Sequence, residues 1–208
     1  SPPALGRMGV VGVVSGRVLA QNLRTGLYEP LGSATDLPVG VPIDARDGVV
    51  SLTTALPGGR TQTADVWGGL FRFEQTKHGD GQTELLLNGP VGPCPARRRA
   101  PQASRESVRG RAALARASAT AASAHASSTS AVAARARAKR RLWSKDSHGK
   151  YTTHGANSAA TVLGTEWLTV DSCAGTLTRV RRGRVRVRDL HNGHVTVLGA
   201  GHSYLARS

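Results

Sequence analysis

Short apolar stretches with a period of two recur along most of this chain, and they constrain its fold more than any other feature. Between about residues 9 and 88, turn residues separate six of them: GVVSGRVLAQ, LYEPL, VPIDA, GVVSLTTAL, GLFRFEQTK and TELLL. Successive side chains of a β-strand point to opposite faces, so this pattern with Gly, Pro, Asp and Asn at the breaks is typical of antiparallel sheets. The region predicts an all-β fold, an antiparallel sandwich or roll of short strands.

The same pattern resumes after residue 141, in the segments KYTTHG, SAATVLGT, EWLTVD, GTLTRVRR, GRVRVRDL, HVTVLGAG and HSYLA. The intervening residues 95–140 contain no aromatic side chain and few large aliphatic ones. They bury too little surface to offset the entropy of ordering, which favours a disordered linker. A solvated, fraying helix is the alternative, because Ala and Arg are strong helix formers.

We therefore divide the chain into an N-terminal β region, residues 9–92, a basic Ala/Arg-rich segment, residues 93–140, and a C-terminal β region, residues 141–208. About 70 residues of β structure would make a thin core alone. The middle segment is accordingly expected to be an insertion within a single sheet fold.

The formal net charge of +15 raises the possibility of nucleic-acid binding. Residues 95–140 hold eleven of the basic residues against one acidic residue, whereas residues 1–94 are nearly neutral. Only four of the 28 basic residues are lysine, and an Arg, Ala, Gly and Val bias is what GC-rich coding produces. The total charge is therefore weak evidence for any partner.

Two cysteines, Cys94 and Cys173, lie in turn-like contexts rather than inside apolar strands. Their pairing would close a loop of about 80 residues, worth roughly 4 to 5 kcal/mol in the chain-entropy model. Two unrelated buried thiols are the alternative. A disulfide favours an oxidising compartment, so we expect an extracytoplasmic protein, secreted or in the periplasm or cell envelope.

No apolar run is long enough for a transmembrane helix. The start, SPPALGRMGVVGVV, has neither an initiator Met nor a typical signal peptide, so we expect a mature or truncated piece.

An arginine-rich stretch from Thr178, TRVRRGRVRVRDL, is the most distinctive local feature. If Arg182 and Gly183 form a two-residue turn, the flanking strands pair as a hairpin, with Val180, Val185 and Val187 on the buried face. The opposite face would then carry an arginine ladder, in which Arg179 faces Arg186 and Arg181 faces Arg184. Its members are Arg179, Arg181, Arg184, Arg186 and Arg188.

In the strand EWLTVD we place Leu168 and Val170 inward, which sends Trp167 and Asp171 outward beside the guanidinium groups. One interpretation is a solvated face, neutralised by Trp167, Asp171 and Asp189. The other is a docking surface for an anionic partner, such as an acidic envelope polymer or an acidic protein, with Trp167 as part of it. Nucleic acid is disfavoured, because aromatic residues are not interleaved with the arginines as stacking readers require.

The catalytic and metal-binding motifs are incomplete. His191 and His194 have HxxH spacing, but the Asn-Gly between them is a hairpin turn signal and no further ligand follows. His154 and Ser203 belong to no nucleophile elbow, and the sequence has no P-loop. We expect no enzyme, no cofactor and no metal, with a basic nucleic-acid or polyanion binder and an unrecognised hydrolase as alternative functions.

The two β regions resemble a known bacterial family, the FecR-like domain. GRVLAQ followed by LPVGVPIDARDGVVSLTTALPGGRTQTADVWGGLFRFEQ is similar to its opening, and AATVLGTEWLTV, GTLTRVRRGRVRVRD and VTVLGAGHSYLA are similar to its later elements. Gly164, Thr165 and Gly183 occupy the family's motif positions. The resemblance implies an all-β extracytoplasmic module without enzymatic activity, with a binding, sensing or structural role in the cell envelope. In the best-known members it takes part in signal transduction to a sigma factor.

Overall fold

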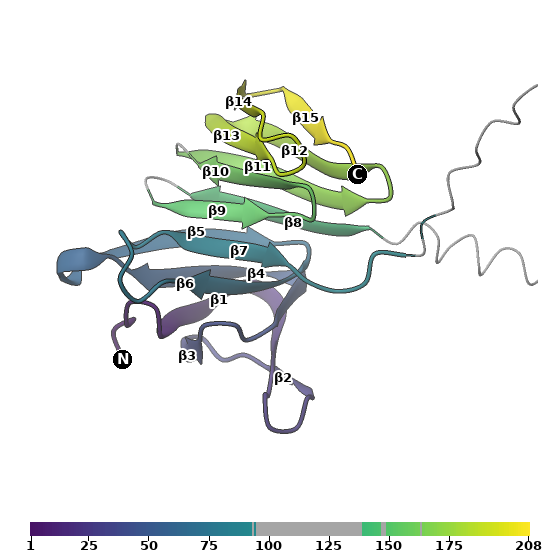
Figure 1. Cartoon of the computed structure of the whole chain (residues 1–208). Coiled ribbons are helices and arrows are strands. Elements are labelled where there is room, and N and C mark those ends of the chain that lie inside the picture. The colour runs from purple at the N-terminus through teal and green to yellow at the C-terminus, as the bar shows by residue number, and fades with distance from the viewer. Residues whose placement is uncertain (93, 95–138, 147–148, 163) are drawn as a thin grey trace, which may run out of the picture.

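The computed structural model describes residues 1–92, 94, 139–146, 149–162 and 164–208. These residues form an all-β fold, as predicted, in which fifteen strands make one sheet that rolls into a nearly closed barrel (Figure 1). The prediction of a disordered linker or fraying helix falls almost entirely outside the described residues.

The first seven strands are β1 (Met8–Gln21), β2 (Tyr28–Pro30), β3 (Thr35–Pro38), β4 (Ile43–Ala55), β5 (Thr61–Trp67), β6 (Leu70–Gln75) and β7 (Thr83–Leu87), with a 3₁₀ turn at Pro57–Gly59. The other eight are β8 (Arg140–Asp146), β9 (Tyr151–His154), β10 (Ser158–Val162), β11 (Thr165–Ser172), β12 (Gly175–Arg182), β13 (Arg184–Asp189), β14 (Val195–Gly199) and β15 (Ser203–Ala206).

Strand order along the sheet is β14-β13-β10-β9-β7-β6-β4-β5-β8-β11-β12-β15, and β1 pairs with β2, β3 and β4. Ile43 at the start of β4 pairs with β6, whereas the rest of that strand, from Val49, pairs with β5. This long strand therefore carries the sheet around the bend. Strands from the two β regions pair at two places, β5 with β8 and β7 with β9, so both regions belong to one sheet.

The interior of the roll is filled by the inward side chains of both regions. Trp167, Tyr151, Phe71 and Phe73 are fully buried there. The Tyr151 hydroxyl donates to the Leu52 carbonyl at 3.0 Å, and burial raises the pKa of this hydroxyl. The large rings thus enter the core with their polar atoms satisfied, which removes the cost of burying an unpaired donor.

The orientation predicted for β11 is wrong. Trp167, Thr169 and Asp171 point inward and are buried, while Leu168 and Val170 lie half-buried on the outer face. The interior provides volume for the indole and a partner for its N–H, which donates to Thr153 Oγ1 at 3.1 Å. Burying an indole removes more apolar surface from water than burying a leucine, and this favours the observed face.

The hairpin predicted at Gly183 is also wrong, although its alternation is confirmed. Val180, Val185 and Val187 are fully buried and the arginines of the ladder are exposed. However, β12 pairs with β11 and β15, whereas β13 pairs with β10 and β14. Gly183 forms a corner between two parts of the sheet. The arginines on β12 therefore do not face those on β13.

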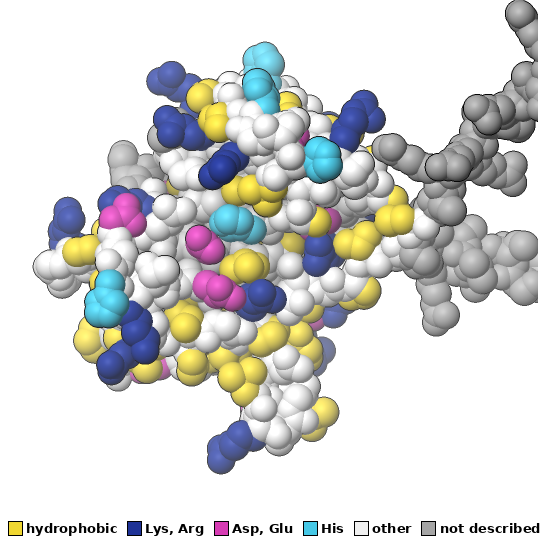
Figure 2. Space-filling view, viewed as in Figure 1, with side chains coloured by type: hydrophobic (Ala, Val, Ile, Leu, Met, Phe, Trp, Pro, Cys, Tyr) yellow, Lys and Arg dark blue, Asp and Glu magenta, His cyan; other side chains and the backbone are white. Residues whose placement is uncertain are grey.

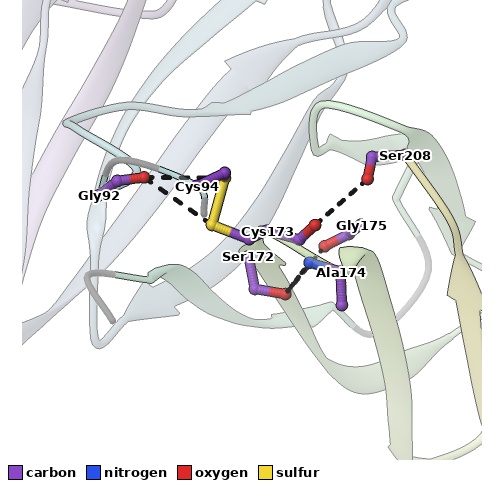
Figure 3. Close-up of a disulfide and its surroundings, with 7 residues drawn as sticks. All are labelled: Gly92, Cys94, Ser172, Cys173, Ala174, Gly175 and Ser208. Atoms are coloured by element: carbon purple, nitrogen blue, oxygen red, sulfur yellow. Dashed lines mark hydrogen bonds between the residues drawn. A yellow bond between two sulfur atoms is a disulfide. The ribbon is translucent and has the colours of Figure 1, made fainter. Parts of the chain in front are cut away.

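The predicted disulfide is confirmed. Cys94 and Cys173 are bonded, and their Cα atoms lie 5.2 Å apart (Figure 3). The bond ties the segment after β7 to the turn between β11 and β12. The Gly92 carbonyl lies 3.8 and 3.9 Å from the two sulfur atoms, and Ser208 Oγ donates to the Cys173 carbonyl at 3.2 Å. The C-terminus is thereby held at the same place.

Candidate binding groove

An open groove with a volume of about 540 Å³ lies on the outer face of the sheet, across β7, β9, β10, β13 and β14. Its lining residues are Gln82, Glu84, Thr152, His154, Ala159, Thr161, Arg186, Arg188, Gly193 and Val195. The outward positions of five neighbouring strands thus converge on one surface. Figure 2 shows this face, with acidic side chains over β6 and β7 and basic side chains over the strands above them.

The groove is ordered by strand register. Glu84 on β7 is opposite Thr152 on β9, Thr152 is opposite Thr161 on β10, and Thr161 is opposite Arg186 on β13. Facing side chains on neighbouring strands lie close enough to interact. This row therefore passes from a carboxylate through two hydroxyls to a guanidinium.

A second row runs beside the first. His154 on β9 is opposite Ala159 on β10, which is opposite Arg188 on β13 and then Val195 on β14. Ala159 leaves open space between the imidazole and the guanidinium, since its side chain is a single methyl group. The two rows together place neutral hydrogen-bonding groups between a negative end and a positive end.

The hydroxyl groups of the groove are fixed by their own hydrogen bonds. Thr152 Oγ1 and Thr161 Oγ1 lie 3.0 Å apart, and Gln82 Nε2 donates to Thr152 Oγ1 at 2.9 Å. Each hydroxyl has one donor and two acceptor sites, so both keep capacity for a ligand. These groups are held in place before a ligand arrives, which reduces the entropy lost on binding.

His154 has an unused hydrogen-bonding atom. Its Nε2 is buried and has no hydrogen-bond partner in the described part of the chain, and Glu84 Oε1 is 3.8 Å away, beyond hydrogen-bonding distance. Buried polar atoms of side chains usually have a partner. The unpartnered nitrogen and the nearby carboxylate therefore make this part of the groove the most suited to a polar ligand.

The two arginines of the groove carry uncompensated charge. Arg186 and Arg188 are exposed, and neither has a carboxylate partner among the described residues. Arg181, on the other strand of the predicted ladder, is instead paired with Glu166 at 2.9 Å. The corner at Gly183 thus divides the predicted surface, with Arg184, Arg186 and Arg188 on one part of the sheet and Arg179 and Arg181 on the other.

None of the three predicted neutralising residues serves the arginine ladder. Trp167 is buried, and Asp171 pairs with Arg140 Nη2 at 2.6 Å. Asp189 points inward and accepts hydrogen bonds from the His191 amide at 2.9 Å and the Tyr204 hydroxyl at 3.0 Å. Burial raises the pKa of Asp189, but these accepted hydrogen bonds outweigh it and leave the pKa below its ordinary value. The prediction failed because all three side chains point into the interior of the sheet, away from the exposed arginines, and contact other residues there.

The residues considered for catalysis or metal binding lie on different elements of the described structure. His191 and His194 are exposed in the turn that joins β13 to β14. His154 lies on β9 and Ser203 on β15, and these strands do not pair. Within the residues that the structure describes, no group of three His, Cys, Asp or Glu side chains is arranged to hold a metal ion.

The residues of the family-like motif meet at the corner. Thr165 Oγ1 donates to the Arg184 carbonyl at 3.1 Å, and the Gly164 carbonyl lies against Gly183. They stabilise the passage from β12 to β13 and line no part of the groove.

The missed groove residues are Gln82, Glu84, Thr152, His154 and Thr161. Their segments, TELLL, KYTTHG and SAATV, were assigned to strands, but pairing between β7 and β9 joins residues about 70 positions apart, and no local pattern predicts it.

No helix in the described ranges is long and apolar enough to span a membrane. No family model, curated protein or solved structure matches the chain.

Proposed function

We propose that this chain is a non-enzymatic extracytoplasmic module that binds an acidic polysaccharide of the cell envelope in the groove across β7, β9, β10, β13 and β14. The proposal rests on one observation: the groove places two guanidiniums that have no carboxylate partner, on Arg186 and Arg188, beside a fixed row of neutral hydrogen-bonding groups and a carboxylate. The extracytoplasmic part rests on the disulfide, because disulfides persist in oxidising compartments. The FecR-like resemblance points the same way and remains a prediction.

An acidic polysaccharide matches each part of the groove. Its anionic groups would bind Arg186 and Arg188 through charge-assisted hydrogen bonds, worth about 1.5 to 3 kcal/mol each. Its hydroxyls would donate to Glu84 and exchange hydrogen bonds with Thr152 and Thr161. A nucleic acid fits less well, since the groove contains a carboxylate and has no aromatic side chain for base stacking.

The test measures the affinity of the full chain for polygalacturonate, with neutral dextran as the ligand control. The double variant Arg186→Gln/Arg188→Gln is expected to weaken polygalacturonate binding at least 10-fold. The matched control Arg179→Gln/Arg182→Gln removes two exposed charges from β12 and is expected to change binding less than 2-fold. Glu84→Gln should also weaken binding, because it removes a charged acceptor for sugar hydroxyls.

Equal losses of polygalacturonate affinity in the two double variants would overturn the proposal that the groove is the binding site. They would show only a general effect of positive charge. Binding to duplex DNA at 150 mM salt that exceeds binding to polygalacturonate would replace the proposal with the polyanion alternative.

A further inference from the structure

A second cavity lies elsewhere on the sheet and shares no lining residue with the groove. Its volume is about 330 Å³, and it is formed by β4, the turn between β5 and β6, the end of β7 and the start of β8. Four basic side chains line it: Arg46, Lys139, Arg140 and Arg141. Asp47 is the single carboxylate among the lining residues.

Two of these arginines are held by buried carboxylates that are not part of the lining. Arg46 binds Asp44 through both Nε and Nη2, with the Nη2 to Oδ2 distance at 2.5 Å. Arg140 Nη2 lies 2.6 Å from Asp171 Oδ2. A guanidinium has five N–H donors, so each retains donors after this pairing. The carboxylates fix the positions of both groups and leave part of their hydrogen-bonding capacity free.

The Arg140 guanidinium also has an unsatisfied donor. Its Nε is buried and has no hydrogen-bond partner in the described part of the chain. Its Nη1 makes one long contact of 3.5 Å with the Leu87 carbonyl. A buried N–H without a partner costs about 1 to 3 kcal/mol, which a bound acceptor could recover.

The remaining two cations, Arg141 and Lys139, supply charge that no carboxylate of the described residues neutralises. Arg141 donates from Nε to the Gly68 carbonyl at 3.2 Å, and its two terminal nitrogens have no hydrogen bond among the described residues. Neither Arg141 nor Lys139 has a carboxylate partner among the described residues. The cavity thus combines two oriented, compensated guanidiniums with two uncompensated cations.

Glycine keeps one wall of the cavity clear of side chains. A Cβ on Gly69 would lie 1.8 Å from the Arg141 carbonyl oxygen, so β8 and the β5–β6 turn approach more closely than any other residue allows. The Asn88 side chain adds a neutral amide to the lining, with its Oδ1 engaged by the Gly89 amide at 2.8 Å. Within the described ranges its amide nitrogen makes no hydrogen bond, so it can donate to a ligand.

We propose that this cavity binds an oxyanion, a phosphate, sulfate or carboxylate group carried on a small polar molecule. Guanidinium forks match the geometry of such groups, and Lys adds a mobile point charge. The volume exceeds the roughly 30 Å³ that one water molecule occupies in the liquid, and it lies at the small end of ligand pockets. There is accordingly room for more than an isolated ion. The site is separate from the groove and does not depend on it.

The test is calorimetric titration of the full chain with inorganic phosphate, sulfate and acetate, and with glycerol phosphate as an organic phosphate. Comparison of the anions assigns the preferred group, and tighter binding of glycerol phosphate than of inorganic phosphate would show that the cavity accepts an attached organic body. Arg141→Met is the main variant, because this side chain is exposed and its removal leaves no buried carboxylate unpaired. Lys139→Met is the second.

Each substitution is expected to weaken binding of the preferred anion about 10-fold. The matched control Arg182→Met removes one exposed arginine from β12, outside both the cavity and the groove, and is expected to leave this affinity unchanged. The absence of binding for all four anions in the millimolar range, or an equal loss in Arg182→Met, would overturn the proposal. Circular dichroism of each variant separates loss of binding from loss of folding.

Discussion

Arg181 and Arg184 are three residues apart, yet they lie on strands that do not pair with each other. Arg181 on β12 binds Glu166 Oε1 at 2.9 Å, whereas Arg184 on β13 is opposite Gly199 of β14. The chain turns a corner between them at Gly183. A single arginine-rich stretch therefore supplies two different surfaces, one partly neutralised and one beside an open groove.

Because Gly183 lies at the corner, we expect alanine to lower the stability of the fold more at this glycine than at Gly193. Gly183 has φ +76°, and a Cβ there would lie 2.2 Å from the Gly164 carbonyl oxygen. Gly193 has φ +73° but no atom within 4 Å of its Cβ position. Gly193→Ala should cost about 1 kcal/mol for the left-handed backbone alone. Gly183→Ala should lower the free energy of unfolding clearly further, because two strands must also separate. Urea titration measures the free energy of unfolding of both variants. Equal losses of stability would contradict the close contact between Gly183 and Gly164 at the corner.

The buried position of Trp167 predicts a large cost for its removal. Trp167→Ala should destabilise the fold by about 3 to 5 kcal/mol through the cavity that it leaves. Trp167→Phe should cost less, with about 1 kcal/mol attributable to the lost hydrogen bond to Thr153. Trp143, stacked on Trp67 on the outer face, offers a matched control. Trp143→Phe is expected to cost less than Trp167→Phe in chemical unfolding, and the reverse order would show that the indole of Trp167 lies outside the core.

The alternation of TRVRRGRVRVRDL identified which side chains are buried, because the period of two is a local property of any strand. Pairing is not local. The same pattern suits a hairpin and a corner, and the choice depends on contact between Gly183 and Gly164, about twenty residues away. In EWLTVD, alternation separates the residues into two sets but does not say which set points inward. Trp167 points inward because its indole N–H binds Thr153 on another strand.

The candidate site was accessible from sequence only in part. Arg186 and Arg188 stood out by composition, and both line the groove. Glu84 and His154 are single polar residues in ordinary strand segments, and they become neighbours only through the parallel pairing of β7 with β9. The cavity around Arg46 and Arg141 arises in the same way, from strands on either side of the segment that the structure does not describe.

Loss of the disulfide should weaken the fold without changing it. Cys94 and Cys173 are 79 residues apart in sequence, and a loop of this length corresponds to roughly 4 to 5 kcal/mol of chain entropy. We expect Cys94→Ser/Cys173→Ser to lower the melting temperature while the circular dichroism spectrum stays that of a β protein. Reductant should lower the melting temperature of the natural sequence and leave that of the variant unchanged. A reductant effect of the same size in both proteins would mean that the bond contributes nothing.

The pairing of Asp44 with Arg46 predicts a stability that depends on acid pH. Hydrogen bonds from the Arg46 guanidinium hold the pKa of the Asp44 carboxyl below its ordinary value, against the opposing effect of burial. The native state therefore binds fewer protons at this site than the unfolded state between the two pKa values. Its contribution to stability is fully present above the unfolded pKa of about 3.9 and is lost as the pH falls through the lower folded pKa.

Asp44→Asn should remove that contribution. We expect the variant to be less stable than the natural sequence at pH 7, with the difference shrinking as the pH falls below about 4. Asp65→Asn is the matched control, because the Asp65 carboxylate on β5 has no hydrogen bond or ion pair among the described residues, and this variant should be nearly as stable as the natural sequence at pH 7. Urea midpoints measured from pH 7 down to pH 2 provide the comparison. A gap between Asp44→Asn and the natural sequence that stays constant over this range would show that the ion pair does not titrate with folding.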